Sequence, residues 1–312
     1  MRMPNRRMQP IRYSGRLMRQ PFGMERSRRI RDMNPRETLQ HLLRMERPLV
    51  MPDAYDSLSA RVIEAIGFKA VQCSGFSMAL ASRAIPEAKL GFEKNLEITR
   101  DIVHAVGVPV MADGEDGFGP PARVFEVVRA FVDAGVSGIN IEDQLLPPSE
   151  AKSVVDRSLM IEKIRAAREA AAAAGAGDLV VNARTDALTV WPHRAEGLRE
   201  AIERGNQYLD AGADLVFVIG VDSLAEAKQV AREIHGPVSI AAGLPNNIGA
   251  MSIGELRECG VARVSLPSVA ILSALRALKQ TLSMIYRAEG FREVTEQGLL
   301  SDMSDVAKIM AR

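Results

Sequence analysis

The chain has 312 residues, of which 47% are hydrophobic and 25% charged, and its formal net charge at pH 7 is +1. This size and balance predict one large α/β domain with a well-buried core, and the lack of a basic field outside the N-terminus argues against nucleic acid as a partner. Two cysteines, Cys73 and Cys259, exclude a disulfide framework, and no apolar run approaches the roughly 18 residues that a membrane span needs.

The first 34 residues differ in composition from the rest of the chain. Residues 1–31 contain ten arginines against one acid, Glu25, and lack the apolar stretch of a secretory signal. Such a segment also resembles an organelle transit peptide, but four residues interrupt any amphipathic helix here: Pro4, Pro10, Gly15 and Pro21. We therefore expect a disordered basic extension, or a true start at Met24, and a cytoplasmic protein.

From residue 35 onward, short apolar runs alternate with amphipathic stretches. The runs predict eight strands, at residues 48–54, 69–75, 108–113, 138–142, 179–184, 214–220, 237–243 and 262–268. The helices between them are expected at residues 57–67, 93–106, 120–135, 158–174, 194–212, 223–236 and 252–260. Parallel strands that are buried on both faces read as continuous apolar runs, and eight βα units favour a (β/α)₈ TIM barrel over an open sheet.

The remaining segments read differently. Residues 76–94 and the loop 144–158 are expected to be irregular, whereas residues 269–287 predict a last core helix. These assignments divide the chain into a basic extension, a barrel domain and a polar helical tail, over residues 1–34, 35–290 and 291–312.

Charged residues follow three of the predicted strands, at the point where each strand ends: Asp113, Glu115, Glu142, Asp143, Arg184 and Asp186. The carboxyl ends of barrel strands meet at one mouth, which is where such barrels keep their chemistry. Hard oxygen ligands beside a fixed cation suit Mg²⁺, with Mn²⁺ as an alternative, and a small anionic substrate. A solvated set of acids is the plainer interpretation, and Arg184 could simply pair with Asp186.

Several other residues are candidates for contact with a substrate. Ser74 and Gly75 end the second strand, where glycine lets backbone N–H groups approach an anion closely, although Ser-Gly is also an ordinary turn. Tyr55 follows the first strand and is expected to reach the mouth. Glu87 and Lys152 lie in loops that could close over it, where charges are also commonly solvated.

Four stretches of the sequence resemble one protein family. They are SLSARVIEAIGFKAVQCSGFS, VPVMADGEDGFG, AGVSGINIEDQ and NARTDA, at residues 57–77, 108–119, 134–144 and 182–187. Over residues 35–290 the chain resembles the isocitrate lyase/phosphoenolpyruvate mutase superfamily. The resemblance implies a (β/α)₈ barrel whose last helix swaps onto a neighbouring subunit, a homotetramer, Mg²⁺, and chemistry through an enolate.

The resemblance also assigns roles to the candidate metal ligands. Asp113 matches the aspartate that holds Mg²⁺, and Glu142 matches the acidic residue after the fourth strand. Glu115 stands where the family usually has a second aspartate, so that Asp-Ala-Asp becomes Asp-Gly-Glu here.

The same resemblance names the residues that would contact the substrate. Ser74, Gly75 and Phe76 match the turn that binds a carboxylate, and Arg184 matches the arginine that clamps the α-oxo acid. Glu87 lies where most members have an aspartate close to the reacting centre.

One loop departs from the family pattern. The carbon–carbon lyases carry a cysteine as general acid after the fourth strand, but residues 144–158 contain no cysteine and no histidine. Retro-aldol cleavage needs a placed acid, whereas decarboxylation next to an α-oxo group chiefly needs a metal. We therefore expect a Mg²⁺-dependent lyase for a small α-oxo or α-hydroxy di-acid, most like oxaloacetate decarboxylation.

Three alternatives stay open at this point. One is a carbon–carbon lyase of the methylisocitrate or dimethylmalate type that uses a different acid. Another is phosphonopyruvate-type chemistry at a P–C bond. The third is a barrel that binds an oxo acid without turnover.

Overall fold

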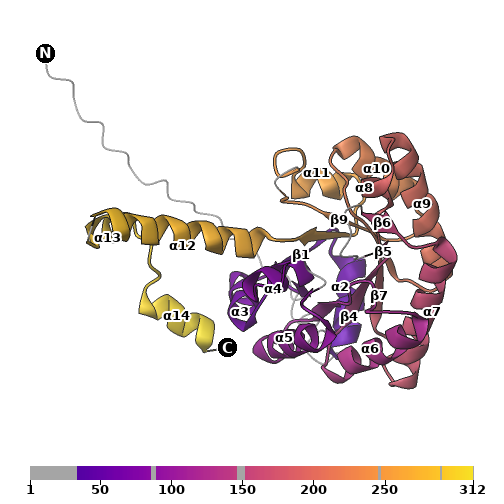
Figure 1. Cartoon of the computed structure of the whole chain (residues 1–312), viewed down its shortest axis with the longest axis horizontal. Helices are drawn as coiled ribbons and strands as arrows, with labels where there is room; N and C mark the ends of the chain where they lie inside the picture. The colour runs from indigo at the N-terminus through magenta and orange to yellow at the C-terminus, as the bar shows by residue number, and fades with distance from the viewer. Residues whose placement is uncertain (1–33, 86–88, 146–151, 245–246, 289, 312) are drawn as a thin grey trace, which may run out of the picture. The chain divides into compact units, whose positions relative to one another are not determined.

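The computed structural model describes residues 34–311 except 86–88, 146–151, 245–246 and 289. Eight parallel strands form a closed barrel in the order β1-β10-β9-β8-β7-β4-β3-β2, with helices around it (Figure 1). The strands are β1 Leu49–Ala54, β2 Val71–Cys73, β3 Val110–Asp113, β4 Gly138–Glu142, β7 Val180–Thr185, β8 Leu215–Val218, β9 Val238–Ala241 and β10 Arg263–Leu266. The predicted (β/α)₈ architecture is confirmed, and each strand lies within its predicted run or differs from it by one residue.

The helices that cover the barrel are α3 Ser57–Ile66, α5 Phe92–Ala105, α6 Pro121–Asp133, α7 Arg157–Ala173, α9 Arg194–Asp210, α10 Leu224–Glu233 and α11 Ile253–Glu258. Their apolar faces pack on the strands. In the largest cluster, Val127 and Phe131 of α6 and Ile164 of α7 are fully buried together with Ile139 and Val181 of the sheet. These contacts hold β3, β4 and β7 in register, so that Asp113 lies beside Asn140 and Glu142 beside Arg184.

A helix that the sequence pattern did not predict, α2 (Pro35–Met45), precedes the first strand. It begins with a capping box between Asn34 and Glu37. Its buried Leu39 packs with Leu49, Met111 and Val180, which lie at or near the amino ends of β1, β3 and β7. The helix thus covers the end of the barrel opposite the strand ends that carry the candidate site.

Two segments that were expected to be irregular contain regular structure. Within residues 76–94, α4 (Gly75–Ala81) forms because the Ser74 side chain accepts a hydrogen bond from Ser77 N–H and because Met78 and Ala79 are buried. Within the loop 144–158, β5 (Gln144–Leu145) and β6 (Ser153–Val154) pair antiparallel. A short helix, α8 (Ala187–Val190), also follows β7. All of these elements are too short for hydrophobic periodicity to reveal.

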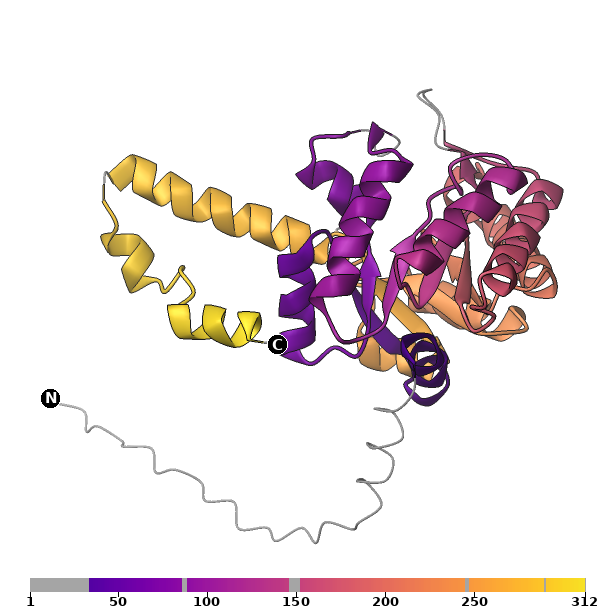
Figure 2. The same ribbon diagram turned by 90° about the horizontal axis from the view of Figure 1, so that it is seen from below.

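The C-terminal segment consists of α12 (Val269–Ala288), α13 (Arg292–Glu296) and α14 (Met303–Met310), and Figure 2 shows α12 reaching beyond the barrel strands. The expectation of a core helix over residues 269–287 is wrong for the single chain, because Leu275, Leu278 and Leu282 are 53–60% exposed. The tail returns to the barrel domain where Arg61 of α3 donates hydrogen bonds to the last carbonyls of α14. In the described part of the chain, no helix is long and apolar enough to cross a membrane.

Candidate active site at the carboxyl ends of the strands

A cavity of about 400 Å³ lies at the carboxyl ends of the barrel strands. Its lining combines polar side chains from the strand ends with apolar ones from the following loops and α12: Asp53, Gln72, Cys73, Ser74, Phe76, Asp113, Asn140, Lys152, Arg184, Phe217, Ile219, Leu244, Ser265, Pro267, Ser268 and Leu272. A space of this size suits a small organic acid.

Three carboxylates gather beside this cavity, and one of them, Asp113, lines it. Asp113, Glu115 and Glu142 each offer an oxygen within 4.8 Å of the others, and all three are buried. Asp113 accepts hydrogen bonds from Gly75 N–H (2.9 Å) and from the Asn140 side chain (3.3 Å). The cluster predicted from the sequence therefore exists, and its oxygen-only donor set is one that Mg²⁺ or Mn²⁺ prefers. Because buried like charges repel strongly, a divalent cation is a fitting occupant for these residues.

The turn that carries Glu115 is tightly attached to the next strand. Gly114 donates a hydrogen bond to the Asn140 carbonyl (2.8 Å), and Glu142 N–H donates to the Glu115 carbonyl (2.9 Å). A Cβ at Gly114 would lie 2.6 Å from the Asn140 carbonyl oxygen, so only glycine fits this approach. Glu115 itself has a φ of 49°, a left-handed conformation that is unusual outside glycine and is often found at functional sites.

Arg184 reaches the same side of the cavity from β7. Its Nε and one Nη donate to both Asp186 oxygens (2.8 and 3.0 Å), and its other Nη lies 2.6 Å from Glu142 Oε2. Burial opposes a charge on the guanidinium, but Asp186 and Glu142 more than offset this, so the pKa of Arg184 lies well above its ordinary value. Arg184 thus both pairs with Asp186 and lines the cavity, as a permanently charged group that an anion would meet.

A network outside the barrel supports this arrangement. Asp143 accepts hydrogen bonds from Tyr208 (2.7 Å), Arg204 (3.0 Å) and the backbone N–H of Asp186 (2.9 Å). Burial raises the pKa of Asp143 despite these bonds. Sequence reasoning missed Arg204 and Tyr208; their spacing of four residues on one face of α9 was the available signal.

A second network lies inside the barrel, next to the cavity. Arg263 is fully buried and donates to Gln72 Oε1 (2.6 Å) and Ser239 Oγ (2.8 Å). Ser265 donates to Asp53 Oδ1 (2.9 Å). Burial raises the pKa of Asp53 to about 7, although Arg263 and the bond from Ser265 lower it. Sequence reasoning assigned no role to Arg263 or Asp53.

The predicted substrate-binding turn lies at the cavity, but its hydrogen-bonding groups already have partners within the protein. Ser74 caps α4, and its N–H donates to the Ala54 carbonyl, while Gly75 N–H donates to Asp113. An anion at this turn would therefore have to replace existing hydrogen bonds. Phe76 lines the cavity and is 42% exposed.

The other predicted contact residues have different outcomes. Tyr55 packs against the hydrophobic cluster of α3, β2 and α4, and it is not among the lining residues of the cavity. Lys152 does line the cavity. Glu87 lies outside the described residues.

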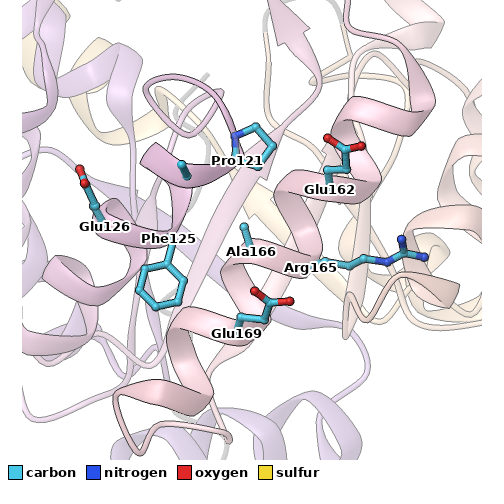
Figure 3. Close-up of a pocket in the computed structure, with 8 residues that line it drawn as sticks. Pro121, Phe125, Glu126, Glu162, Arg165, Ala166 and Glu169 are labelled. Atoms are coloured by element: carbon cyan, nitrogen blue, oxygen red, sulfur yellow. The ribbon is translucent and has the colours of Figure 1, made fainter.

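A second cavity lies between α6 and α7 on the outside of the barrel (Figure 3). It is lined by Pro121, Ala122, Phe125, Glu126, Glu162, Arg165, Ala166 and Glu169. None of these residues belongs to the carboxylate cluster or lies at a strand end. The strand-end cavity is therefore the better candidate for an active site.

A closed parallel barrel with a carboxylate cluster at the carboxyl ends of its strands defines the chain as a (β/α)₈-barrel enzyme. A model of the phosphoenolpyruvate phosphomutase family matches residues 39–286. The chain belongs to the phosphoenolpyruvate mutase/isocitrate lyase superfamily. The predicted resemblance is thereby confirmed.

Individual relatives differ in the reactions that their names describe. The 2,3-dimethylmalate lyase of Eubacterium barkeri is 31% identical over 251 residues, which cover 79% of this chain and 84% of that protein. A solved phosphonopyruvate hydrolase, in complex with oxalate and Mg²⁺, is 29% identical with a TM-score of 0.77, covering 89% of this chain and 95% of that one. A solved oxaloacetate acetylhydrolase with its product oxalate is 27% identical with a TM-score of 0.72, covering 81% and 88%.

Proposed function

We propose that the chain is a Mg²⁺-dependent lyase that acts on a small α-oxo or α-hydroxy di-acid through an enolate, most like the decarboxylation of oxaloacetate. The observation that carries this proposal is that Arg184 and Asp113 line one cavity of about 400 Å³, while Arg184 also pairs with Glu142 of the carboxylate cluster. The guanidinium of Arg184 beside a divalent-metal site is the arrangement that would hold both oxygens of an α-oxo carboxylate. The related hydrolase that contains oxalate and Mg²⁺ supports the same ligand class.

The roles of the chain's residues follow from their contacts. Asp113, Glu115 and Glu142 would hold Mg²⁺, which supplies a Lewis acid that stabilises negative charge on the α-oxo group. Arg184 orients the substrate carboxylate, while its paired Asp186 keeps the guanidinium plane fixed. Phe217, Leu244 and Leu272 form an apolar part of the lining, which limits the access of water.

The reaction type depends on which acids the site offers. Carbon–carbon cleavage of a methylisocitrate-like acid needs a placed general acid, and the loop 144–158 contains neither cysteine nor histidine. Cys73 lines the cavity, but burial raises the pKa of its thiol to about 12. Decarboxylation releases CO₂ directly and leaves an enolate that must be stabilised and then protonated at carbon.

Carbon–carbon cleavage is the second candidate, and one observation favours it. The 2,3-dimethylmalate lyase is 31% identical and matches most of the chain. A lyase of this type would release an oxo acid and a second acid rather than CO₂. The two candidates therefore differ in a product that can be measured.

The test compares substrates side by side. With the protein and Mg²⁺, oxaloacetate should lose CO₂ faster than with Mg²⁺ alone, and Asp113→Ala or Glu142→Ala should return the rate to that background. Arg184→Lys should weaken the activity, because a lysine ammonium cannot form a bidentate contact with the substrate carboxylate. Glu126→Gln, in the second cavity between α6 and α7, is the matched control and should have no effect on the rate. Rapid cleavage of 2-methylisocitrate or 2,3-dimethylmalate, with oxaloacetate untouched, would put the second candidate first.

We also propose that α12 packs on another subunit of a homotetramer. Leu275, Leu278 and Leu282 lie on one helix face and are more than half exposed in the single chain. Light scattering at micromolar concentration should report an oligomer, and Leu278→Glu should dissociate it. Lys279→Glu, the neighbouring residue, is the control that should not. A wild-type monomer under these conditions would refute the assembly.

A further inference from the structure

The cavity contains a carboxyl group that the metal cluster does not use. Among the described lining residues, the carboxylates are those of Asp113 and Asp53. Asp53 belongs to β1, and β2 separates it from β3, which carries Asp113. The carboxylate of Asp113 accepts hydrogen bonds from Gly75, Glu115 and Asn140, not from the β1 side. Asp53 is therefore a separate group that shares the cavity with the cluster.

Its surroundings hold Asp53 in place without fixing its charge. Ser265 donates to Oδ1 at 2.9 Å, and the side chain is only 5% exposed. The nearest buried cation, Arg263, gives its hydrogen bonds to Gln72 and Ser239 instead. A carboxyl group that is buried and lacks a direct ion pair favours its neutral form.

The charged and titratable groups that face Asp53 act in both directions. Burial is the largest influence and raises its pKa to about 7, followed by Arg263 and the Ser265 bond, which lower it. Asp113 raises it by a smaller amount, and Cys73 faces it from β2. A cation bound at Asp113 would remove this smaller influence and would itself favour the carboxylate, so the metal-free protein is the state in which the raised pKa is to be measured.

We propose that Asp53 is the proton donor that protonates the enolate carbon. This inference rests on the proposed function. When the bond between the enolate carbon and the departing carboxylate breaks, CO₂ leaves and the electron pair stays in the enolate. The O–H bond of Asp53 then breaks, a C–H bond forms at that carbon to give the oxo acid, and the Asp53 carboxylate regains a proton from water.

The other proton carriers in the cavity are poorer candidates. The Cys73 thiol holds its proton too firmly, because burial raises its pKa to about 12. Lys152 is exposed to solvent, where an ammonium group stays hydrated. Asp53 is buried, accepts a hydrogen bond from Ser265 and lies at the cavity wall, and its pKa is nearer neutrality than that of Cys73.

Proton exchange on the product tests this role without decarboxylation. With Mg²⁺ in D₂O, the wild type should exchange the methyl hydrogens of pyruvate for deuterium, as followed by NMR. Asp53→Asn should reduce the exchange by about 10²–10⁴-fold while oxalate binding is retained. Asp56→Asn, three residues along and outside the cavity, should exchange normally. Unchanged exchange in Asp53→Asn, or loss in Lys152→Met instead, would overturn the proposal.

A second variant keeps the test open if Asp53→Asn does not fold. Exchange begins when the ionised Asp53 takes a methyl proton from pyruvate, so its rate should fall at low pH. Ser265→Ala removes a hydrogen bond that favours the carboxylate, so this acidic limb of the exchange rate should move to higher pH. A merely structural role for Asp53 would lower the rate without moving this limb. An unmoved limb in Ser265→Ala counts against the proton donor.

The closing experiment needs neither substrate nor metal. In the metal-free protein, ¹³C NMR of the aspartate carboxyls should show a signal that titrates near neutral pH and is missing in Asp53→Asn. If Asp53 stays ionised down to pH 5, the proton donor is refuted whatever the protein catalyses. If Asp53 titrates and exchange depends on it but oxaloacetate is not decarboxylated, the proton donor stands and the proposed reaction fails.

Discussion

Two arginines are almost completely buried on opposite faces of the barrel sheet, and their partners differ. Arg204, from α9 on the outside, pairs with Asp143 at 3.0 Å and Glu200 at 2.8 Å. Arg263, inside the barrel, donates to the neutral side chains of Gln72 and Ser239. Burial opposes both charges, but Tyr208 and Asp143 raise the pKa of Arg204, whereas the pKa of Arg263 falls to about 10.

The difference teaches what each charge does. The charge of Arg204 is neutralised by adjacent carboxylates, so its effect is confined to the strand ends that Asp143 supports. Among the described residues, no carboxylate forms an ion pair with Arg263, whose charge acts at longer range on Asp53 and Asp113. Arg204 therefore stabilises the structure. Arg263 makes the electrostatic potential in the cavity more positive, which favours anions and opposes protonation.

The largest expected effect comes from breaking the outer network. Arg204→Met should lower the free energy of unfolding by about 3–5 kcal/mol, because Asp143 is left buried without its cation. Urea denaturation measures this loss, and the double variant with Asp143→Asn should recover part of it. A loss within about 0.5 kcal/mol, as at an ordinary surface site, would remove the distinction between the two arginines.

A smaller effect on stability is expected inside the barrel. Arg263→Met should destabilise less than Arg204→Met, because it removes a buried charge that has no direct counter-ion. Its effect should fall on the cavity: oxalate binding, measured by calorimetry, should weaken about tenfold, or ~1.4 kcal/mol. Because Arg263 lowers the pKa of Asp53, its removal should raise that pKa and move the acidic limb of proton exchange to higher pH. An acidic limb that moves to lower pH would contradict this assignment.

The barrel and the metal cluster could be predicted from the sequence because both depend on local pattern. Buried parallel strands are continuous apolar runs, and acids at their carboxyl ends must meet at one mouth. Asp113, Glu115 and Glu142 were found in this way. Helix α4 was missed because seven residues are too few to show a helical period, although Ser74 offered a cap.

Other features depend on contacts between distant segments, which pattern cannot show. The apolar residues of α12 have the period of a core helix, but nothing in a period says whether the core belongs to the same chain. Tyr55 was placed at the mouth because it follows a strand, yet it packs against the hydrophobic cluster that includes residues of α3, β2 and α4. The unusual pKa of Asp53 arises from burial by several strands, so its sequence position alone could not indicate it.

The close approach at Gly114 has a consequence for how this site can change over evolutionary time. The superfamily usually has Asp-Ala-Asp where this chain has Asp113, Gly114 and Glu115. Gly114→Ala alone would place a methyl group 2.6 Å from a backbone carbonyl of β4, so the strand itself would have to move. Single substitutions that each keep the fold therefore cannot restore the common triplet. The backbone around Asn140 must change before Gly114 can be replaced, and the choice of Glu or Asp at position 115 depends on that earlier change.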